Sequence, residues 1–334
     1  MQRVVYVILQ LDEAGRFIRD GRLEHLRVAL LLLDNAAELQ LDRKIQERLM
    51  HERFREKLRH TILQLPRDRV SGTLSDLLAW QPLSKDDKRK LDRTFDEKVK
   101  QLADRWNELD RRLAGPLIYL HRYRNEAYHR ARVRPATIRT AALLLLEINC
   151  ILLLTLKLGM TIISSGEDYS WLEERFGVNA HAFLGDQPTL ERIVEAVRGD
   201  MLPSTEAVTG TLVKHLNSRF EELYDALDFI VQNTEVNDRP EAFRRSQYAL
   251  AIHAGHIAPS FSALAEYRPS VDFDSLAKLE ARIAEIASAP DRVEAFNRFA
   301  RIEAELEPIE APVHRGAAEI DEQIQAEIDR RRGK

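Results

Sequence analysis

Apolar residues recur at intervals of three and four positions between Leu23 and Lys44, and this spacing places them on one face of an α-helix. They stand at positions 23, 26, 30, 33, 37 and 41. The chain has only 13 glycines and 12 prolines in 334 residues, so long stretches lack the turn residues that an all-β fold requires. We therefore predict an all-α fold, in which a helical bundle is followed by a second all-helical domain.

The same patterns predict where later helices begin and end. Residues 86–113 are expected to form one charged amphipathic helix. Gly115 and Pro116 then predict a break before a helix over 117–133, because proline is tolerated in the first turn of a helix. A leucine-rich helix is expected over 137–163. The helices expected in the C-terminal half span 188–199, 205–231, 240–266, 275–288, 291–306 and 316–332.

A short polar stretch, Ser164-Ser165-Gly166, is the expected boundary between two domains, residues 1–164 and 165–334. The first half has 31 basic and 22 acidic residues, a net charge of +9, whereas the second has 19 and 32, a net charge of −13. This asymmetry predicts a basic half that meets a polyanion. Chance segregation of charge on two solvated surfaces is the alternative.

The acidic half has three candidate roles. It restrains the basic half until a trigger releases it, it docks a separate sensor or antitoxin protein, or it is a plain helical scaffold. Electrostatic restraint would weaken as salt is added, because exposed charges are screened over about 8–10 Å.

The chain is expected to be cytoplasmic and to make no use of a membrane. Its one cysteine, Cys150, excludes a disulfide framework and a cysteine-based zinc site, and is expected to be buried. The amino terminus has no secretory signal pattern. The most hydrophobic segment, residues 143–163, carries Glu147, Asn149 and Lys157, so a buried core helix is favoured over a membrane span.

The stretch from His121 to Arg130 has the residue types of a catalytic site. On a helix, Arg122, Asn125 and His129 share one face, since residues three, four and seven apart are neighbours. Arg124 falls on a different, apolar ridge. A guanidinium is rarely buried without an acidic partner or a bound anion, so something must compensate Arg124.

Asp34 and Glu38 are the candidate partners of Arg124, because they are four residues apart at the edge of the apolar seam of the first long helix. Such an acidic pair could hold the guanidinium by charge-assisted hydrogen bonds. The alternative is that both carboxylates are solvated residues on the flank of the helix.

The segment around this motif is strongly basic. Residues 111–139 contain eight arginines, no lysine and one acidic residue, with three interleaved tyrosines that include Tyr128. Arginine binds phosphate in a bidentate manner, and aromatic rings stack on unpaired bases, so the segment indicates single-stranded RNA as partner. Arg130, Arg132 and Arg134 are the expected RNA-binding residues. A solvated basic helix face is the alternative.

The arginine and histidine spacing, with asparagine directly after the arginine, resembles the motif of the HEPN superfamily. Both Arg-x4-His (Arg124) and Arg-x6-His (Arg122) spacings end at His129. The Leu-Leu-Leu-Asp-Asn-Ala-Ala-Glu run at 31–38 is also similar to HEPN proteins of prokaryotic defence and toxin systems. The resemblance covers roughly residues 20–163.

This resemblance implies a metal-independent endoribonuclease of toxin or antiviral-defence type, with no cofactor, that works as a homodimer with a shared cleft. His129 would take the proton from a ribose 2′-hydroxyl, Arg124 and Arg122 would stabilise the phosphorane, and Asn125 would orient the histidine or the phosphate. Some family toxins carry a tyrosine two residues after the histidine, where this chain has Ala131. Two alternatives stay open, namely a non-catalytic RNA- or nucleotide-binding module and a helical protein–protein adaptor.

Overall fold

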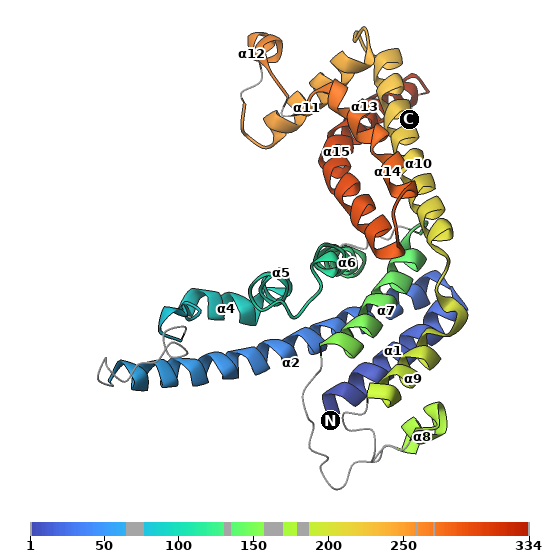
Figure 1. Cartoon of the computed structure of the whole chain (residues 1–334). Helices are drawn as coiled ribbons and strands as arrows, with labels where there is room; N and C mark the ends of the chain where they lie inside the picture. The colour runs from blue at the N-terminus through green and yellow to red at the C-terminus, as the bar shows by residue number, and fades with distance from the viewer. Residues whose placement is uncertain are drawn as a thin grey trace. The chain divides into compact units, whose positions relative to one another are not determined.

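The fold is described from a computed structural model, which covers residues 2–64, 77–129, 135–156, 170–178, 187–257, 260–269 and 271–332, without the side chains of residues 2, 3, 129, 200, 261 and 265. Every regular element within these ranges is a helix, which confirms the all-α fold (Figure 1). The chain divides into two compact units, Met1–Pro203 and Ser204–Lys334.

The first unit is built on a helical hairpin. The helices α1 (Gln2–Asp20) and α2 (Leu23–Leu63) reverse at Gly21, whose φ of 75° lies in the left-handed region that glycine adopts most readily. The leucine-rich helix α7 (Ile138–Thr155) packs on both, and α9 (Gln187–Arg198) packs on α1 and α7 (Figure 1). These contacts follow from the apolar periodicity, since each helix buries a stripe of aliphatic side chains against the others.

The helix α7 is the core helix of this unit. Among the described residues, α7 is the one helix that is both long enough and apolar enough to cross a membrane. However, 78% of its 18 residues are buried inside the protein, as in the core helix of a soluble protein. Each leucine buried in this way contributes about 1.5–3 kcal/mol. Cys150 lies in this core as expected, and burial raises the pKa of its thiol to about 12.

The expected single helix over 86–113 was wrong, because the structure divides it. This part of the chain forms α4 (Lys85–Arg93), α5 (Phe95–Lys100) and a π-helical turn, η2 (Gln101–Arg105). A capping box between Ser84 and the third residue of α4 fixes the start of this segment. Most apolar residues of the segment are buried, and their spacing is continuous although the helices are interrupted. The buried ones include Leu91, Phe95, Val99, Leu102, Leu109 and Leu113.

The helix α6 (Arg111–His129) begins before the expected break at Gly115 and Pro116, so that break was also wrong. The chain turns earlier instead, at Asn107, where φ is 51°. Asparagine tolerates this left-handed conformation better than most residues. The side chain of Asp110 then accepts a hydrogen bond of 2.9 Å from a backbone N–H in the first turn of α6. The expected end of this helix at residue 133 lies outside the described residues.

The expected domain boundary at residue 164 also lies outside the described residues. The structure divides the chain between Pro203 and Ser204, and the helix α8 (Ser170–Phe176), α9 and the 3₁₀ turn η3 (Gly199–Met201) belong to the first unit. Divided there, the first unit has 34 basic and 30 acidic residues, a net charge of +4, and the second has 16 and 24, a net charge of −8. The charge asymmetry keeps its sign and becomes smaller.

The second unit is built on two long helices that pack together, α10 (Thr205–Asn233) and α15 (Arg292–Arg331). Two separate helices were expected where α15 runs unbroken, although Pro308 and Pro312 lie inside it. Each proline removes one backbone hydrogen bond, but one face of the helix around them is buried, which keeps the helix continuous. The buried residues there are Leu306, Ile309, Pro312 and Val313. The shorter helices of this unit are α11 (Arg239–His253), α12 (Phe261–Glu266), α13 (Phe273–Ala281) and α14 (Ile283–Ala287).

Candidate functional site

Packing of α6 on α2 brings Arg124 onto Asp34. The Nε of Arg124 donates to Oδ2 of Asp34 at 2.6 Å, and Nη2 donates to the same oxygen. The Asp34 side chain is 1% exposed and the Arg124 side chain 17%, while Oε1 of Glu38 lies 3.6 Å from Nη2. The partner expected from the sequence is therefore present, and it fixes the orientation of the guanidinium.

The second oxygen of Asp34 contacts His121. The Nδ1 of His121 lies 2.9 Å from Oδ1 of Asp34 and 3.6 Å from Oε1 of Glu38. The ring of Phe95 stacks on the imidazole, with centroids 4.1 Å apart and planes 8° apart. These two residues were not predicted as part of the site. His121 is three residues before Arg124 and so shares its helix face, which is a signal that the sequence contains. Phe95 comes from another helix, and no local spacing indicates it.

Asn125 completes the contacts of the guanidinium, because Nη1 of Arg124 donates to its Oδ1 at 2.7 Å. The backbone of His129 ends α6, four residues after Asn125, but its side chain lies outside the described residues. The expected RNA-binding residues also lie outside them. These are Arg130, Arg132 and Arg134.

Arg122 does not join this group. Its guanidinium lies 2.5 Å from Oδ2 of Asp96 on α5, and its side chain is 64% exposed. Of the two arginines that match the motif spacing, Arg124 is the one placed against the acidic residues of α2.

A buried amide pair fixes α2 next to Asp34. The Nε2 of Gln40 donates to Oδ1 of Asn149 on α7 at 2.9 Å. The Nδ2 of Asn149 donates in turn to the carbonyl of Leu33 at 3.0 Å, and Leu33 directly precedes Asp34. Both amides are fully buried, so these bonds hold the backbone that carries the carboxylate in one register against the core helix.

The ligand atoms of Asp34, Glu38 and His121 lie within 4.8 Å of one another, which is close enough for three ligands of one metal ion. The guanidinium of Arg124 already contacts both carboxylates, however. A divalent cation there would face this positive charge at short range, which costs free energy in a partly buried site. The group therefore fits an arginine-centred ion-pair cluster better than a metal centre.

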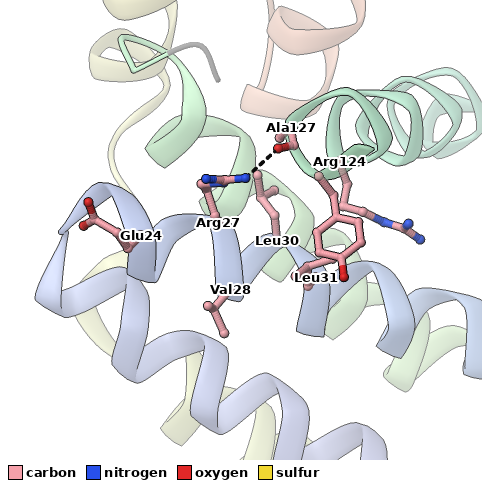
Figure 2. Close-up of a pocket in the computed structure, with 8 residues that line it drawn as sticks. Glu24, Arg27, Val28, Leu30, Leu31, Arg124 and Ala127 are labelled. Atoms are coloured by element: carbon pink, nitrogen blue, oxygen red, sulfur yellow. Dashed lines mark hydrogen bonds between the residues drawn. The ribbon is translucent and has the colours of Figure 1, made fainter. Parts of the chain in front are cut away.

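A pocket of about 230 Å³ adjoins this cluster between α2 and α6 (Figure 2). Its α2 side consists of residues at three- and four-residue spacing, and its α6 side is the stem of Arg124 with the residues one turn later. Arg27 crosses the gap, and its Nη2 donates to the carbonyl oxygen of Ala127 at 3.0 Å. The lining residues are Glu24, Arg27, Val28, Leu30, Leu31, Arg124, Ala127 and Tyr128.

Comparison with family models, with curated proteins and with solved structures finds no match to the chain. The candidate functional residues are therefore the cluster of Arg124, Asp34, Glu38, His121 and Asn125 together with the residues of the adjoining pocket. These residues combine a fixed cation, an imidazole and an apolar recess on neighbouring turns of two helices.

Proposed function

We propose that the chain is a metal-independent endoribonuclease of toxin or antiviral-defence type that acts in the cytoplasm. The observation that carries the proposal is the guanidinium of Arg124, which is held on one side by Asp34 and on the other by Asn125, beside an apolar pocket. A cation fixed before the substrate arrives does not have to reorganise in the transition state, and this is the property that makes charged groups effective in catalysis.

In the proposed reaction, His129 takes the proton from a ribose 2′-hydroxyl. The freed oxygen attacks the adjacent phosphorus, and the bond from phosphorus to the 5′-oxygen breaks. In a homodimer, His129 of the second copy would return a proton to that 5′-oxygen. Arg124 would stabilise the added charge on the phosphorane, and Asn125 would keep the guanidinium in place. The products would be a 2′,3′-cyclic phosphate and a 5′-hydroxyl, and DNA would not be cut.

The same contacts also fit a second candidate function, a non-catalytic RNA- or nucleotide-binding module in which Arg124 has a structural role. Asp34 and Glu38 offset the charge of Arg124, and Asp34 takes up two of its donor groups. A guanidinium engaged in this way contributes less attraction to a phosphate than a solvated one would, and its removal would disturb the packing of α6 on α2.

Incubation of the full chain with single-stranded RNA in the presence of a chelator tests the proposal. Wild-type protein should produce fragments with 2′,3′-cyclic phosphate ends, and both His129→Ala and Arg124→Ala should lose this activity. His51→Ala and Arg53→Ala are matched controls, since both residues are exposed on α2 and neither lines the cluster or the pocket.

Each other outcome identifies an alternative. RNA binding that resists the chelator, without cleavage by any form, would replace the nuclease with the binding module. Absence of both binding and cleavage would leave Arg124 and His129 as structural residues of an adaptor. Cleavage that persists in His129→Ala would mean that another group acts as the base. His121, which contacts the same carboxylate as Arg124, would then be substituted next.

A further inference from the structure

We infer that the pocket between α2 and α6 receives one unstacked base of single-stranded RNA, and that Arg27 and Glu24 select guanine there. This inference rests on the proposed function, because it names the nucleotide that would lie beside Arg124. It is tested by binding, which is measured separately from cleavage.

The size of the pocket limits what it can hold. Pockets for whole drug-sized ligands have volumes of about 300–1,000 Å³. At about 230 Å³ this pocket is smaller, so it suits a fragment such as a single planar base whose sugar and phosphate stay outside. The apolar part of the lining comes from Val28, Leu30 and Leu31 on α2 and from Ala127 on α6, and it would give a base apolar surface to contact (Figure 2).

Tyr128 supplies an aromatic ring at the pocket. Its side chain is 57% exposed although it lines the pocket. Base stacking on an exposed aromatic ring is a common basis for binding unpaired RNA, and it is tolerant of sequence. The stacking therefore accounts for binding of a base but not for the choice among the four.

The polar groups of the pocket account for that choice. Glu24 and Arg27 lie three residues apart on α2, and both line the pocket, so a carboxylate and a guanidinium are available at its wall. Arginine donates most often to O6 and N7 of guanine. A carboxylate accepts from two adjacent donors, and guanine is the base that offers an N1–H beside an exocyclic amino group. Adenine and cytosine each place an acceptor next to the amino group, and uracil has no amino group.

The place of Arg124 links the pocket to the proposed chemistry. Figure 2 shows the stem of Arg124 along one side of the pocket, with its guanidinium turned away from Arg27. A base in the pocket would therefore have the Arg124 guanidinium on the far side of the same side chain, where a phosphate joined to that nucleotide would lie. The pocket would then select the nucleotide at the linkage that is cut.

Binding to short RNAs that cannot be cleaved tests the inference. The full chain would be titrated with fluorescent 2′-fluoro oligouridylates that carry one central guanine or one central adenine. The guanine probe should bind more tightly. Tyr128→Ala should weaken binding of both probes by about tenfold, since one stacked base contributes roughly that factor. Val28→Trp should also weaken binding of both probes. Val28 lines the pocket and is 38% exposed, so the larger side chain would fill the pocket. Glu24→Gln should abolish the difference between the probes.

Tyr6→Ala and Glu13→Gln are matched controls, because Tyr6 is 52% exposed, Glu13 is partly exposed, and neither lines the pocket. Circular dichroism would establish that each variant is folded. Wild-type affinity in both Tyr128→Ala and Val28→Trp would overturn the inference, and so would failure of the wild type to bind either probe. Equal affinity of the wild type for the two probes would overturn the choice of guanine.

The two proposals fail separately. Cleavage of RNA by the wild type, with no effect of the pocket variants on binding, would overturn the pocket and leave the nuclease. Guanine binding that depends on the pocket, with no cleavage, would overturn the nuclease and leave the pocket.

Discussion

The Nε of Arg124 lies 2.6 Å from Oδ2 of Asp34, although the two residues are 90 positions apart in the chain. Since Asp34 is 1% exposed, the charge of the carboxylate is stabilised mainly by this guanidinium and by the imidazole of His121. The pair therefore has two consequences, one for the stability of the first unit and one for the geometry of the candidate site.

Asp34→Asn should destabilise the protein. Removal of one partner of a buried ion pair costs about 3–5 kcal/mol, and we expect about 2–3 kcal/mol here because Arg124 is 17% exposed and keeps Glu38 as a neighbour. Urea denaturation measures this as a lower midpoint with an unchanged slope. Asp104→Asn is the control, since its pair with Arg111 is exposed and should contribute less than about 1 kcal/mol. Equal effects of the two substitutions would mean that the buried pair contributes no more than a surface pair.

The amides of Gln40 and Asn149 should behave as a coupled pair. Asn149→Leu leaves the buried amide of Gln40 without its hydrogen-bond acceptor, so we expect a loss of about 1–3 kcal/mol. Gln40→Leu should cost less, because Asn149 keeps its bonds to two carbonyl groups. The double variant should cost less than the sum of the two, because it leaves neither amide unpaired. Denaturation of the four proteins gives the coupling energy, and strict additivity would contradict this account.

The sequence predicts that Arg124 pairs with Asp34, because the spacing within each helix shows which face each residue lies on. Leu117, Leu120 and Ala127 mark the ridge of α6 as buried, so a guanidinium on the same ridge needs an acidic partner, and Asp34 occupies a seam position that faces it. Phe95 could not be predicted in this way. Its stack on His121 depends on how a third helix packs, and that packing depends on tertiary contacts rather than on spacing along one helix.

The fold was predictable as a class, but the interruptions of its helices were not. The apolar spacing of 86–113 continues through the π-helical turn at Gln101–Arg105 and through the non-helical residues 106–110, because Leu102 and Leu109 are buried there although the backbone is not α-helical. In α15 the sequence predicts a break between two helices where the structure has one continuous helix. Proline usually ends a helix, but burial around Pro308 and Pro312 overrides that tendency. Local signals misplace an element where tertiary burial decides its extent.

As the pH rises, the second unit of Glu303→Gln should become increasingly stable relative to that of the wild type. Burial raises the pKa of Glu303 to about 9, and the carboxylates of Glu307 and Glu310 add to the rise. Arg219, 2.5 Å away, opposes it, and His215 lies 3.6 Å away. Between the unfolded value of about 4.3 and about 9, the folded state binds more protons than the unfolded state, so the free energy of unfolding falls as pH increases.

The substitution removes this titration, while Arg219 keeps its bonds to Glu310. The free energy of unfolding of Glu303→Gln relative to wild type should therefore increase between about pH 7 and about pH 9, by at most about 1.4 kcal/mol per pH unit. The melting temperature of the variant relative to wild type should rise over the same range. Glu305→Gln is the control, because that side chain is 53% exposed and pairs with Arg282 at the surface. A difference between variant and wild type that is constant over this range would contradict a raised pKa for Glu303.

Arg124→Lys should separate charge from geometry at the candidate site. A lysine keeps the positive charge beside Asp34, so this variant should be more stable in urea than Arg124→Ala. Its compact ammonium cannot reproduce the planar fork in which Nε and Nη1 of Arg124 donate to Asp34 and Asn125. If the proposed nuclease uses this fork to hold a donor toward the phosphorane, cleavage should fall by about 100-fold or more, the usual effect of losing one oriented donor. Arg53→Lys on the exposed face of α2 should leave both stability and cleavage unchanged. Full cleavage by Arg124→Lys would mean that charge alone is required and that the contact with Asn125 has no part in the reaction.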